Sequence, residues 1–255
     1  MLDLRHDLSL ALDRAEFAYA AGLEPDPWQQ ELLSSESPRV LLNCSRQSGK
    51  STMAGLLALH RALFYSDSLV LVLAPALRQS QELFGKVTTF YRRLEAPVPA
   101  RSQTALTLTL ENGSRVISLP GNEKNIRGYS GADLLIVDEA ARVEDELYYS
   151  VRPMLAVSGG RLLMLSTPYG KRGAFYEEWT KGAGWERYTV TAEECPRINA
   201  AFLEEERLAL GSWWFEQEYH CQFMDTIDAV FREEDIQAAF ENDLKPLFGD
   251  DVEVA

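Results

Sequence analysis

A short loop between an apolar segment and an amphipathic one constrains this chain more than any other feature. Residues 44–51 read Cys-Ser-Arg-Gln-Ser-Gly-Lys-Ser, and they follow the apolar run 39–43 and precede the amphipathic stretch 52–64. A loop of this composition between a strand and a helix surrounds phosphate groups with backbone N–H groups, and the helix dipole adds positive charge. In this pattern Lys50 reaches the β- and γ-phosphates, and the Ser51 hydroxyl binds Mg²⁺.

Two positions of the loop depart from its common form. Cys44 stands where the first glycine is expected, and Arg46 places a guanidinium inside the loop. A guanidinium there either neutralises charge on the γ-phosphate during transfer or forms an ion pair that stabilises the loop. Of the two interpretations, we expect the phosphate role.

A second segment predicts the acidic half of a nucleotide site. Residues 133–139 read Asp-Leu-Leu-Ile-Val-Asp-Glu, which is a short apolar strand that ends in two carboxylates. A buried parallel strand delivers such residues to its carboxyl end. Asp138 is then expected on the Mg²⁺ side of the nucleotide, and Glu139 is expected to activate the attacking water as a general base. Either motif alone could be a turn or an ordinary strand end, but together and in this order they predict nucleotide hydrolysis.

Composition bounds the class of protein. The chain has 255 residues, 46% of them hydrophobic, which suffices for one large α/β domain with an appendage. No apolar run is long enough to span a bilayer, and the N-terminus does not have the pattern of a signal peptide, so we expect a cytoplasmic protein without a membrane partner. Three scattered cysteines argue against a disulfide framework or a zinc site. The net charge of −14 predicts that any DNA binding is local, weak and dependent on salt.

The order of elements predicts an α/β fold with a central, mostly parallel sheet flanked by helices. Strand-like and helix-like segments alternate, and a hairpin pattern around residues 111–113 interrupts them. Past residue 192 the pattern is helical only, so we expect an ATPase core at 1–192 and a small helical linker or lid at 193–255. We expect strands at 39–44, 69–74, 133–138, 161–166 and 187–191, and helices at 5–20, 51–64, 76–94, 143–156, 200–210 and 212–223.

With Cys-Ser-Arg-Gln-Ser-Gly-Lys-Ser at 44–51 and Leu-Leu-Ile-Val-Asp-Glu-Ala at 134–140, the chain resembles the large subunit of tailed-phage terminases. The resemblance implies a P-loop NTPase of the additional-strand, catalytic-glutamate type. The resemblance also accounts for the two departures in the loop, Cys44 and Arg46, because they are expected features of this family. Three further segments match the family: one with Gln29 as reader of the adenine base, one with Thr167 as sensor of the γ-phosphate, and one with Arg127 as arginine finger toward a neighbouring subunit.

The resemblance also implies a function. It indicates an ATP-hydrolysing motor that uses Mg²⁺ and drives double-stranded DNA into a procapsid in the host cytoplasm. The implied partners are DNA, a portal protein, a small terminase subunit and further copies of the chain in a ring. Full-length members continue into a nuclease with clustered carboxylates. Because Asp250 and Asp251 are adjacent in a polar tail, we expect no nuclease activity from this chain.

The candidate site residues form three groups. The expected catalytic residues are Glu139, Arg46, Arg127 and Thr167. The expected metal ligands are Ser51 and Asp138. The residues expected to bind the nucleotide are Gln29, Ser45, Arg46, Gln47, Ser48, Gly49, Lys50, Ser51 and Thr52.

Several alternatives stay open from sequence alone. Gln29 either reads the base or caps a helix, and Arg127 is either a finger or a solvated arginine. A set of basic and polar residues is either a DNA-tracking surface or a solvated face: Arg78, Gln79, Lys86, Arg92, Arg93, Lys171 and Arg172. Two other functions compete with the packaging motor, namely a helicase-like or remodelling ATPase, which would need a second recA-like lobe, and a nucleotide-binding scaffold that does not hydrolyse ATP. Measured turnover separates the scaffold from the motor.

Overall fold

The structure, a computed structural model, describes residues 4–121 and 128–225 of the 255-residue chain. The part of the chain up to Met224 forms one compact unit. The division of the chain after residue 192 stays a prediction. Among the described residues, no helix has both the length and the apolarity that crossing a bilayer requires.

One eight-stranded sheet organises the unit, with strand order β3-β4-β5-β2-β6-β7-β1-β8. β3 and β4 pair antiparallel, as do β4 and β5, and all other neighbouring pairs are parallel. The predicted mostly parallel sheet is therefore confirmed. The strands are β1 (Arg39–Cys44), β2 (Leu69–Ala74), β3 (Ala100–Gln103), β4 (Thr107–Leu110), β5 (Arg115–Pro120), β6 (Leu134–Asp138), β7 (Arg161–Ser166) and β8 (Glu186–Val190).

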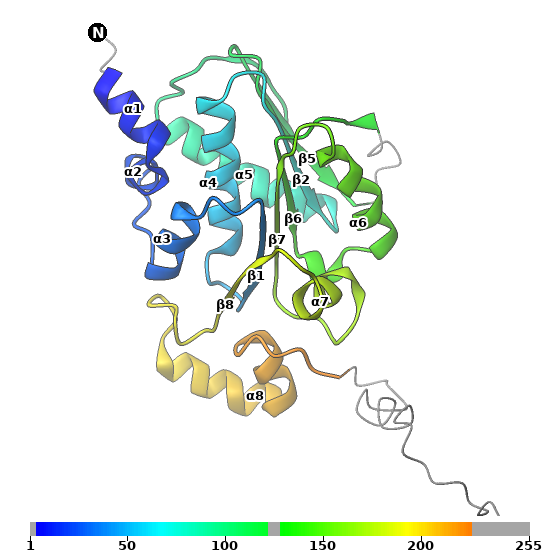
Figure 1. The fold of residues 1–255 in the computed structure, drawn as a ribbon. Coiled ribbons are helices and arrows are strands. Elements are labelled where there is room, and N and C mark those ends of the chain that lie inside the picture. The colour runs from blue at the N-terminus through cyan, green and yellow to red at the C-terminus, as the bar shows by residue number, and fades with distance from the viewer. Residues whose placement is uncertain (1–3, 122–127, 226–255) are drawn as a thin grey trace, which may run out of the picture. The chain divides into compact units, whose positions relative to one another are not determined.

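Helices cover both faces of the sheet, as predicted (Figure 1). Alternate side chains of each central strand point to opposite faces, so one strand supplies two cores. In β7, Leu163 and Leu165 join the core with α2 to α5, whereas Leu162 and Met164 join the core with α6 and α7. The helices are α1 (Leu4–Leu12), α2 (Arg14–Ala20), α3 (Pro27–Ser34), α4 (Lys50–Phe64), α5 (Leu77–Arg93), α6 (Asp145–Val151), α7 (Gly173–Thr180) and α8 (Ala200–Glu218).

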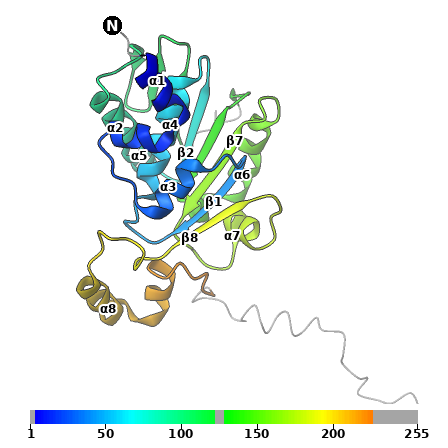
Figure 2. The same cartoon turned by 60° about the vertical axis from the view of Figure 1, so that its left-hand side comes forward.

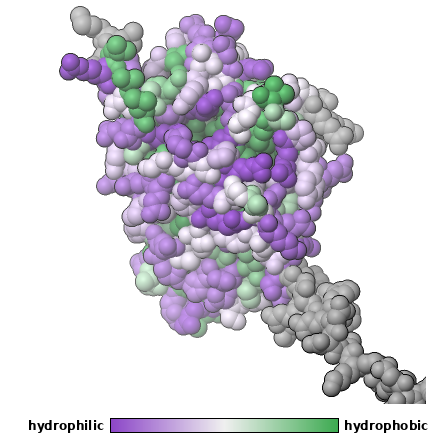
Figure 3. Space-filling view, in the orientation of Figure 1, coloured by the Kyte–Doolittle hydropathy of each residue, from purple (hydrophilic) through white to green (hydrophobic). Residues whose placement is uncertain are grey.

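The N-terminal helix differs from the prediction of one helix over residues 5–20. The chain forms two helices because Asp13 has an extended backbone and its carboxylate accepts the N–H groups of Ala15 and Glu16, which caps α2. On α1, Leu4, Leu8 and Leu12 are 77%, 55% and 79% exposed. They form the hydrophobic strip at the upper left of Figure 3.

Two other helices end earlier than predicted. α6 ends at Val151 and continues as the 3₁₀ helix η3 (Arg152–Leu155), because Pro153 has no N–H to donate within an α-helix. α8 begins after the cap Asn199, as predicted, and is interrupted at Gly211, whose φ of 73° and ψ of 166° are not helical, so the predicted stop at Gly211 is confirmed. It ends at Glu218 rather than at residue 223. β3 was not predicted, because its sequence, Ala-Arg-Ser-Gln, is exposed throughout and has no apolar alternation.

Candidate nucleotide-binding site

The candidate site lies where β6, β7 and β1 end. These strands are neighbours and run parallel, so their carboxyl ends meet at one edge of the sheet. Asp138 pairs in register with Leu165, and Asn43 pairs with Ser166. This edge therefore joins the loop after β1, the acidic end of β6 and the polar end of β7. The end of α8 lies next to the same edge in two views (Figures 1 and 2).

The loop itself is built around residues with a left-handed backbone. Gln47 has a φ of 59° and Gly49 a φ of 97°, and α4 begins immediately after, at Lys50. A Cβ at Gly49 would lie 2.9 Å from Nε2 of Gln29, so only glycine fits this position without displacement. The hydroxyls of Ser45 and Ser48 are buried and have no hydrogen-bond partner among the described residues.

Four predicted residues meet at this edge. Nζ of Lys50 lies 3.5 Å from Oε1 of Glu139, and the Ser51 hydroxyl donates to Oδ1 of Asp138 at 3.2 Å. Lys50 and Asp138 are buried, with 7% and 4% exposure. Burial, reinforced by the charge of Glu139, raises the pKa of Asp138 to about 6. A positive charge near Asp138 would lower this pKa again.

The residues present fit a magnesium ion. The Asp138 carboxylate and the Ser51 hydroxyl are oxygen ligands, the type that Mg²⁺ prefers, and they already lie within hydrogen-bond distance of each other. Glu139 does not share the strand geometry of Asp138. Its φ of 49° and ψ of 43° turn the backbone at the strand end, and its N–H donates to Oδ1 of Asp138 at 3.0 Å. The two adjacent carboxylates therefore face different parts of the site.

Arg46 is held by the end of α8. Its Nε lies 2.5 Å from Oε2 of Glu218, and its backbone N–H donates to the Glu218 carbonyl at 3.2 Å. The ion-pair interpretation of Arg46 is thus the arrangement present, and the phosphate role stays a prediction. The Glu218 side chain is 9% exposed, whereas that of Arg46 is 60% exposed, which leaves the guanidinium accessible.

Two arginines at the site were not predicted. Arg142 lies 3.9 Å from Glu139 and 3.7 Å from Glu218, and its guanidinium stacks over the Tyr169 ring. Its position three residues after Glu139 in Glu-Ala-Ala-Arg was the available signal.

Arg197 braces the phosphate-binding loop from the chain beyond β8. It pairs with Asp26 at 2.7 Å and donates to the Ser48 carbonyl at 2.9 Å. No local signal marks it, since it lies 149 residues from Ser48.

The remaining predicted residues divide into placed and unplaced ones. Gln29 caps α3, because its Oε1 accepts the Asp26 N–H at 3.0 Å, and its Nε2 faces Gly49 of the loop. Thr167 is buried at the end of β7, where its carbonyl accepts the Ser166 hydroxyl at 2.7 Å. Thr52 accepts a hydrogen bond from Lys86 at 3.0 Å. Arg127 lies outside the described residues.

The candidate DNA-facing residues are not one uniform surface. Lys86 belongs to the nucleotide side: burial lowers its pKa, with Asp138 acting in the opposite direction. Arg78 pairs with Glu82 on the exposed side of α5. Arg93 reaches back to the Ala21 carbonyl. The predicted set therefore contains residues with different structural roles.

In the described part of the chain, the cysteines and histidines form no metal site and no disulfide. Within the described residues, no group of three or more His, Cys, Asp or Glu side chains has the arrangement of a metal cluster. Cys44, Cys195 and Cys221 are free, buried thiols.

The chain is similar to terminase large subunits in sequence. A family model described as terminase large subunit, T4likevirus-type, N-terminal, matches residues 41–238. The large subunit of Thermus virus P23-45 is 25% identical over 254 residues, which is 85% of this chain and 52% of the relative. That of Escherichia phage T5 is 25% identical and covers 90% of this chain and 55% of the relative. The chain thus spans about half the length of these relatives.

Solved structures share the fold. The large terminase ATPase domain of Thermus phage P74-26 superposes with a TM-score of 0.74 at 23% identity, over 82% of this chain and 98% of that domain. The large terminase of a thermophilic bacteriophage, in complex with ADP, gives a TM-score of 0.64 at 9% identity, over 78% of this chain and 54% of that one. The family match covers most of the chain. It includes Lys50, Ser51, Asp138 and Glu139, the residues that meet at the sheet edge. The chain belongs to the terminase large subunit family, to which it corresponds in the N-terminal region.

Proposed function

We propose that this chain is the ATP-hydrolysing motor part of a terminase and that it drives double-stranded DNA into a procapsid. The observation that carries the proposal is the meeting of Lys50, Ser51, Asp138 and Glu139 at one edge of a parallel sheet. Relatives in fold support nucleotide binding, because the large terminase of the thermophilic bacteriophage was solved with ADP and also with ATP-γ-S.

The proposed roles follow from charge and position. The loop N–H groups and Lys50 hold the phosphates, and Glu139 accepts a proton from the water that attacks the γ-phosphate. Ser51 and Asp138 would hold Mg²⁺, which neutralises phosphate charge when it is bound. Gln29 contacts the adenine base from beside the loop. The other loop residues, Ser45 to Ser48 with Gly49 and Thr52, complete the phosphate cradle.

The arginines and Thr167 respond to the γ-phosphate. Arg46 leaves Glu218 to contact the phosphate, so nucleotide binding removes an ion pair between the loop and α8. Thr167 directly follows β7, the strand beside β6, and senses the phosphate from there. Arg127 acts toward a neighbouring copy. Hydrolysis is thereby linked to movement of α8.

The assembly is also part of the proposal. By family, the chain acts in a ring of copies, with a portal protein and a small terminase subunit, in the host cytoplasm at the procapsid. DNA contact is local because the chain carries a net charge of −14. A helicase-like ATPase and a non-hydrolysing scaffold are the competing functions.

The test measures phosphate release from ATP in Mg²⁺ and, as a control, in EDTA, each with and without duplex DNA. We expect turnover only with Mg²⁺, and faster turnover with DNA. A rate that rises more than linearly with protein concentration supports a site completed by a neighbour. Bound ATP without turnover in any condition would support the scaffold instead.

A further inference from the structure

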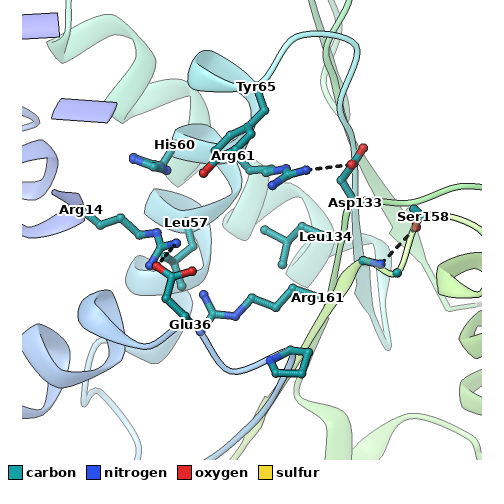
Figure 4. A pocket seen from close by; sticks show the side chains of 13 residues that line it. Arg14, Glu36, Leu57, His60, Arg61, Tyr65, Asp133, Leu134, Ser158 and Arg161 are labelled. Atoms are coloured by element: carbon teal, nitrogen blue, oxygen red, sulfur yellow. Dashed lines mark hydrogen bonds and ion pairs between the residues drawn. The ribbon is translucent and has the colours of Figure 1, made fainter. Parts of the chain in front are cut away.

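A cavity lies at the opposite, amino-terminal edge of the sheet from the nucleotide site. It has a volume of about 240 Å³, and three arginines from separate elements line it (Figure 4). They are Arg14 at the start of α2, Arg61 in the last turn of α4 and Arg161 at the start of β7. Arg61 lies eleven residues along α4 from Lys50, which corresponds to about 16 Å along the helix axis. The two sites are therefore separate.

The cavity holds more positive than negative charge. Arg14 pairs with Glu36 at 2.9 Å, and Arg61 pairs with Asp133 at 2.8 Å. Within the described ranges, Arg161 has no carboxylate at ion-pair distance, and its guanidinium donates to the Ser35 hydroxyl at 3.2 Å.

Two carboxylates, those of Glu36 and Glu186, favour the charged form of Arg161, but neither lies at ion-pair distance from it. Glu186 accepts the Ser35 hydroxyl rather than contacting Arg161 itself. Burial, followed by the charge of Arg14, lowers the pKa of Arg161. His60, which also lines the cavity, adds no charge at neutral pH because burial lowers its pKa to about 4.

Two donors in the cavity wall have no acceptor. Nε of Arg61 and Nε of Arg161 are buried, and neither has a hydrogen-bond partner in the part of the chain that the structure describes. A buried N–H without an acceptor destabilises the fold, and a buried cation without a counter-charge does so more strongly. An anion with several acceptor oxygens in the cavity would supply the missing acceptors and balance the excess charge of the lining.

We propose that this cavity binds a phosphoryl group. Arg14 and Arg161 point toward one another across the cavity, and Arg61, which pairs with Asp133, lines it from α4 (Figure 4). Together they offer donors from more directions than the two oxygens of a carboxylate can use. The group comes either from free phosphate or from the backbone of a nucleic acid. The proposal does not rest on ATP hydrolysis, since none of its residues belongs to the nucleotide site.

The first test measures thermal unfolding with inorganic phosphate against chloride at equal ionic strength. Saturating Mg·ADP is present throughout, so the phosphate-binding loop is filled. We expect the melting temperature to rise by about 3–5 °C at a phosphate concentration of about ten Kd. Arg161→Gln and Arg61→Gln should each lose most of this rise. Arg115→Gln should keep it, because Arg115 is an exposed arginine at the same sheet edge but outside the cavity.

Arg115→Gln distinguishes binding at a specific site from the general stabilising effect of phosphate, because that general effect acts equally on all three variants. Arg161→Gln also removes a partly buried charge that has no ion-pair partner among the described residues, so its melting temperature in chloride should equal or exceed that of the wild type. A stable variant that fails to respond to phosphate is therefore not a folding artefact. Equal phosphate responses in the wild type, Arg161→Gln and Arg115→Gln would overturn the proposal. So would an equal response of the wild type to acetate.

A second measurement identifies the source of the phosphoryl group. Fluorescence anisotropy follows binding of a labelled DNA duplex to the same variants. Weaker DNA binding by Arg161→Gln than by Arg115→Gln, together with competition by phosphate, assigns the site to the DNA backbone. Unchanged DNA binding with the phosphate response intact assigns it to free phosphate. Either result supports the site.

Discussion

At the carboxyl edge of the sheet, Lys50 lies 3.5 Å from Glu139, whereas at the amino edge Arg161 contacts the hydroxyl of Ser35 and no carboxylate among the described residues. The first edge buries an acid, Asp138, whose pKa is raised to about 6. The second holds the partly buried guanidinium of Arg161, whose pKa burial lowers. Burial disfavours the charged form in both cases, but the charges have opposite sign.

Our two proposals assign different kinds of ligand to the two edges of one sheet. α4, β6 and β7 contribute to both edges: their residues at one end suit a metal ion with a nucleotide, and those at the other end suit an anion. The same elements connect the two sites. If the sites are energetically independent, a substitution at one edge should leave ligand binding at the other edge unchanged. The following variants test that independence and the charge balance of each edge.

The largest effect is expected from Lys50→Ala. It removes the cation that faces Glu139 and the phosphates, so ATP affinity should fall about 100-fold, which equals about 3 kcal/mol. Turnover should fall with it. Isothermal titration with ATP gives the affinity, and Lys181→Ala, at an exposed position after α7, is the matched control. An altered phosphate response at the amino edge in Lys50→Ala would contradict independence of the two edges.

Asp138→Asn should change the pH dependence of stability. The folded pKa of Asp138 is raised, so its contribution to stability is full below its ordinary pKa and is lost as the pH rises through about 6. Without divalent ions, the wild type should therefore lose about 3 kcal/mol relative to Asp138→Asn between about pH 3 and pH 7. Urea unfolding across that range measures it. Mg²⁺ should restore the wild type alone, and identical pH profiles would count against the raised pKa.

Part of the molecule could be predicted from the sequence because it depends on local order. The carboxyl ends of parallel strands lie at one edge of the sheet. Lys50, Asp138 and Glu139 follow or end such strands in the sequence, so the sequence alone predicts that they lie at the same edge. The five predicted strands lie within one residue of their observed bounds. The family resemblance added Gln29, which lies in the first turn of α3, and Thr167, which directly follows β7.

The rest depends on contacts between distant residues. Arg197 braces Ser48 across 149 residues, and Arg14, Arg61 and Arg161 converge only in the folded chain. No spacing in the sequence marks such a set. β3 lacked a signal because its side chains are exposed, and the break at Asp13 depends on a capping geometry within an otherwise helical pattern.

The smallest effect is expected from Glu218→Gln. It weakens the ion pair with Arg46, which is 60% exposed and hence screened by solvent, so the free energy of unfolding should fall by about 1 kcal/mol. Chemical denaturation measures the change. Glu204→Gln is the control, because Glu204 pairs with Arg207 on the exposed side of α8. If Glu218→Gln and Glu204→Gln unfold alike, Glu218 does not hold the loop to α8.

Glu139→Gln, measured for both ATP binding and ATP hydrolysis in Mg²⁺, tests most directly whether Glu139 is the general base. The substitution keeps the shape of the side chain but removes its ability to accept a proton. We expect turnover to fall at least about 100-fold, whereas ATP affinity should change by less than about tenfold. Turnover equal to that of the wild type would contradict the assignment of Glu139 as the general base at this edge of the sheet.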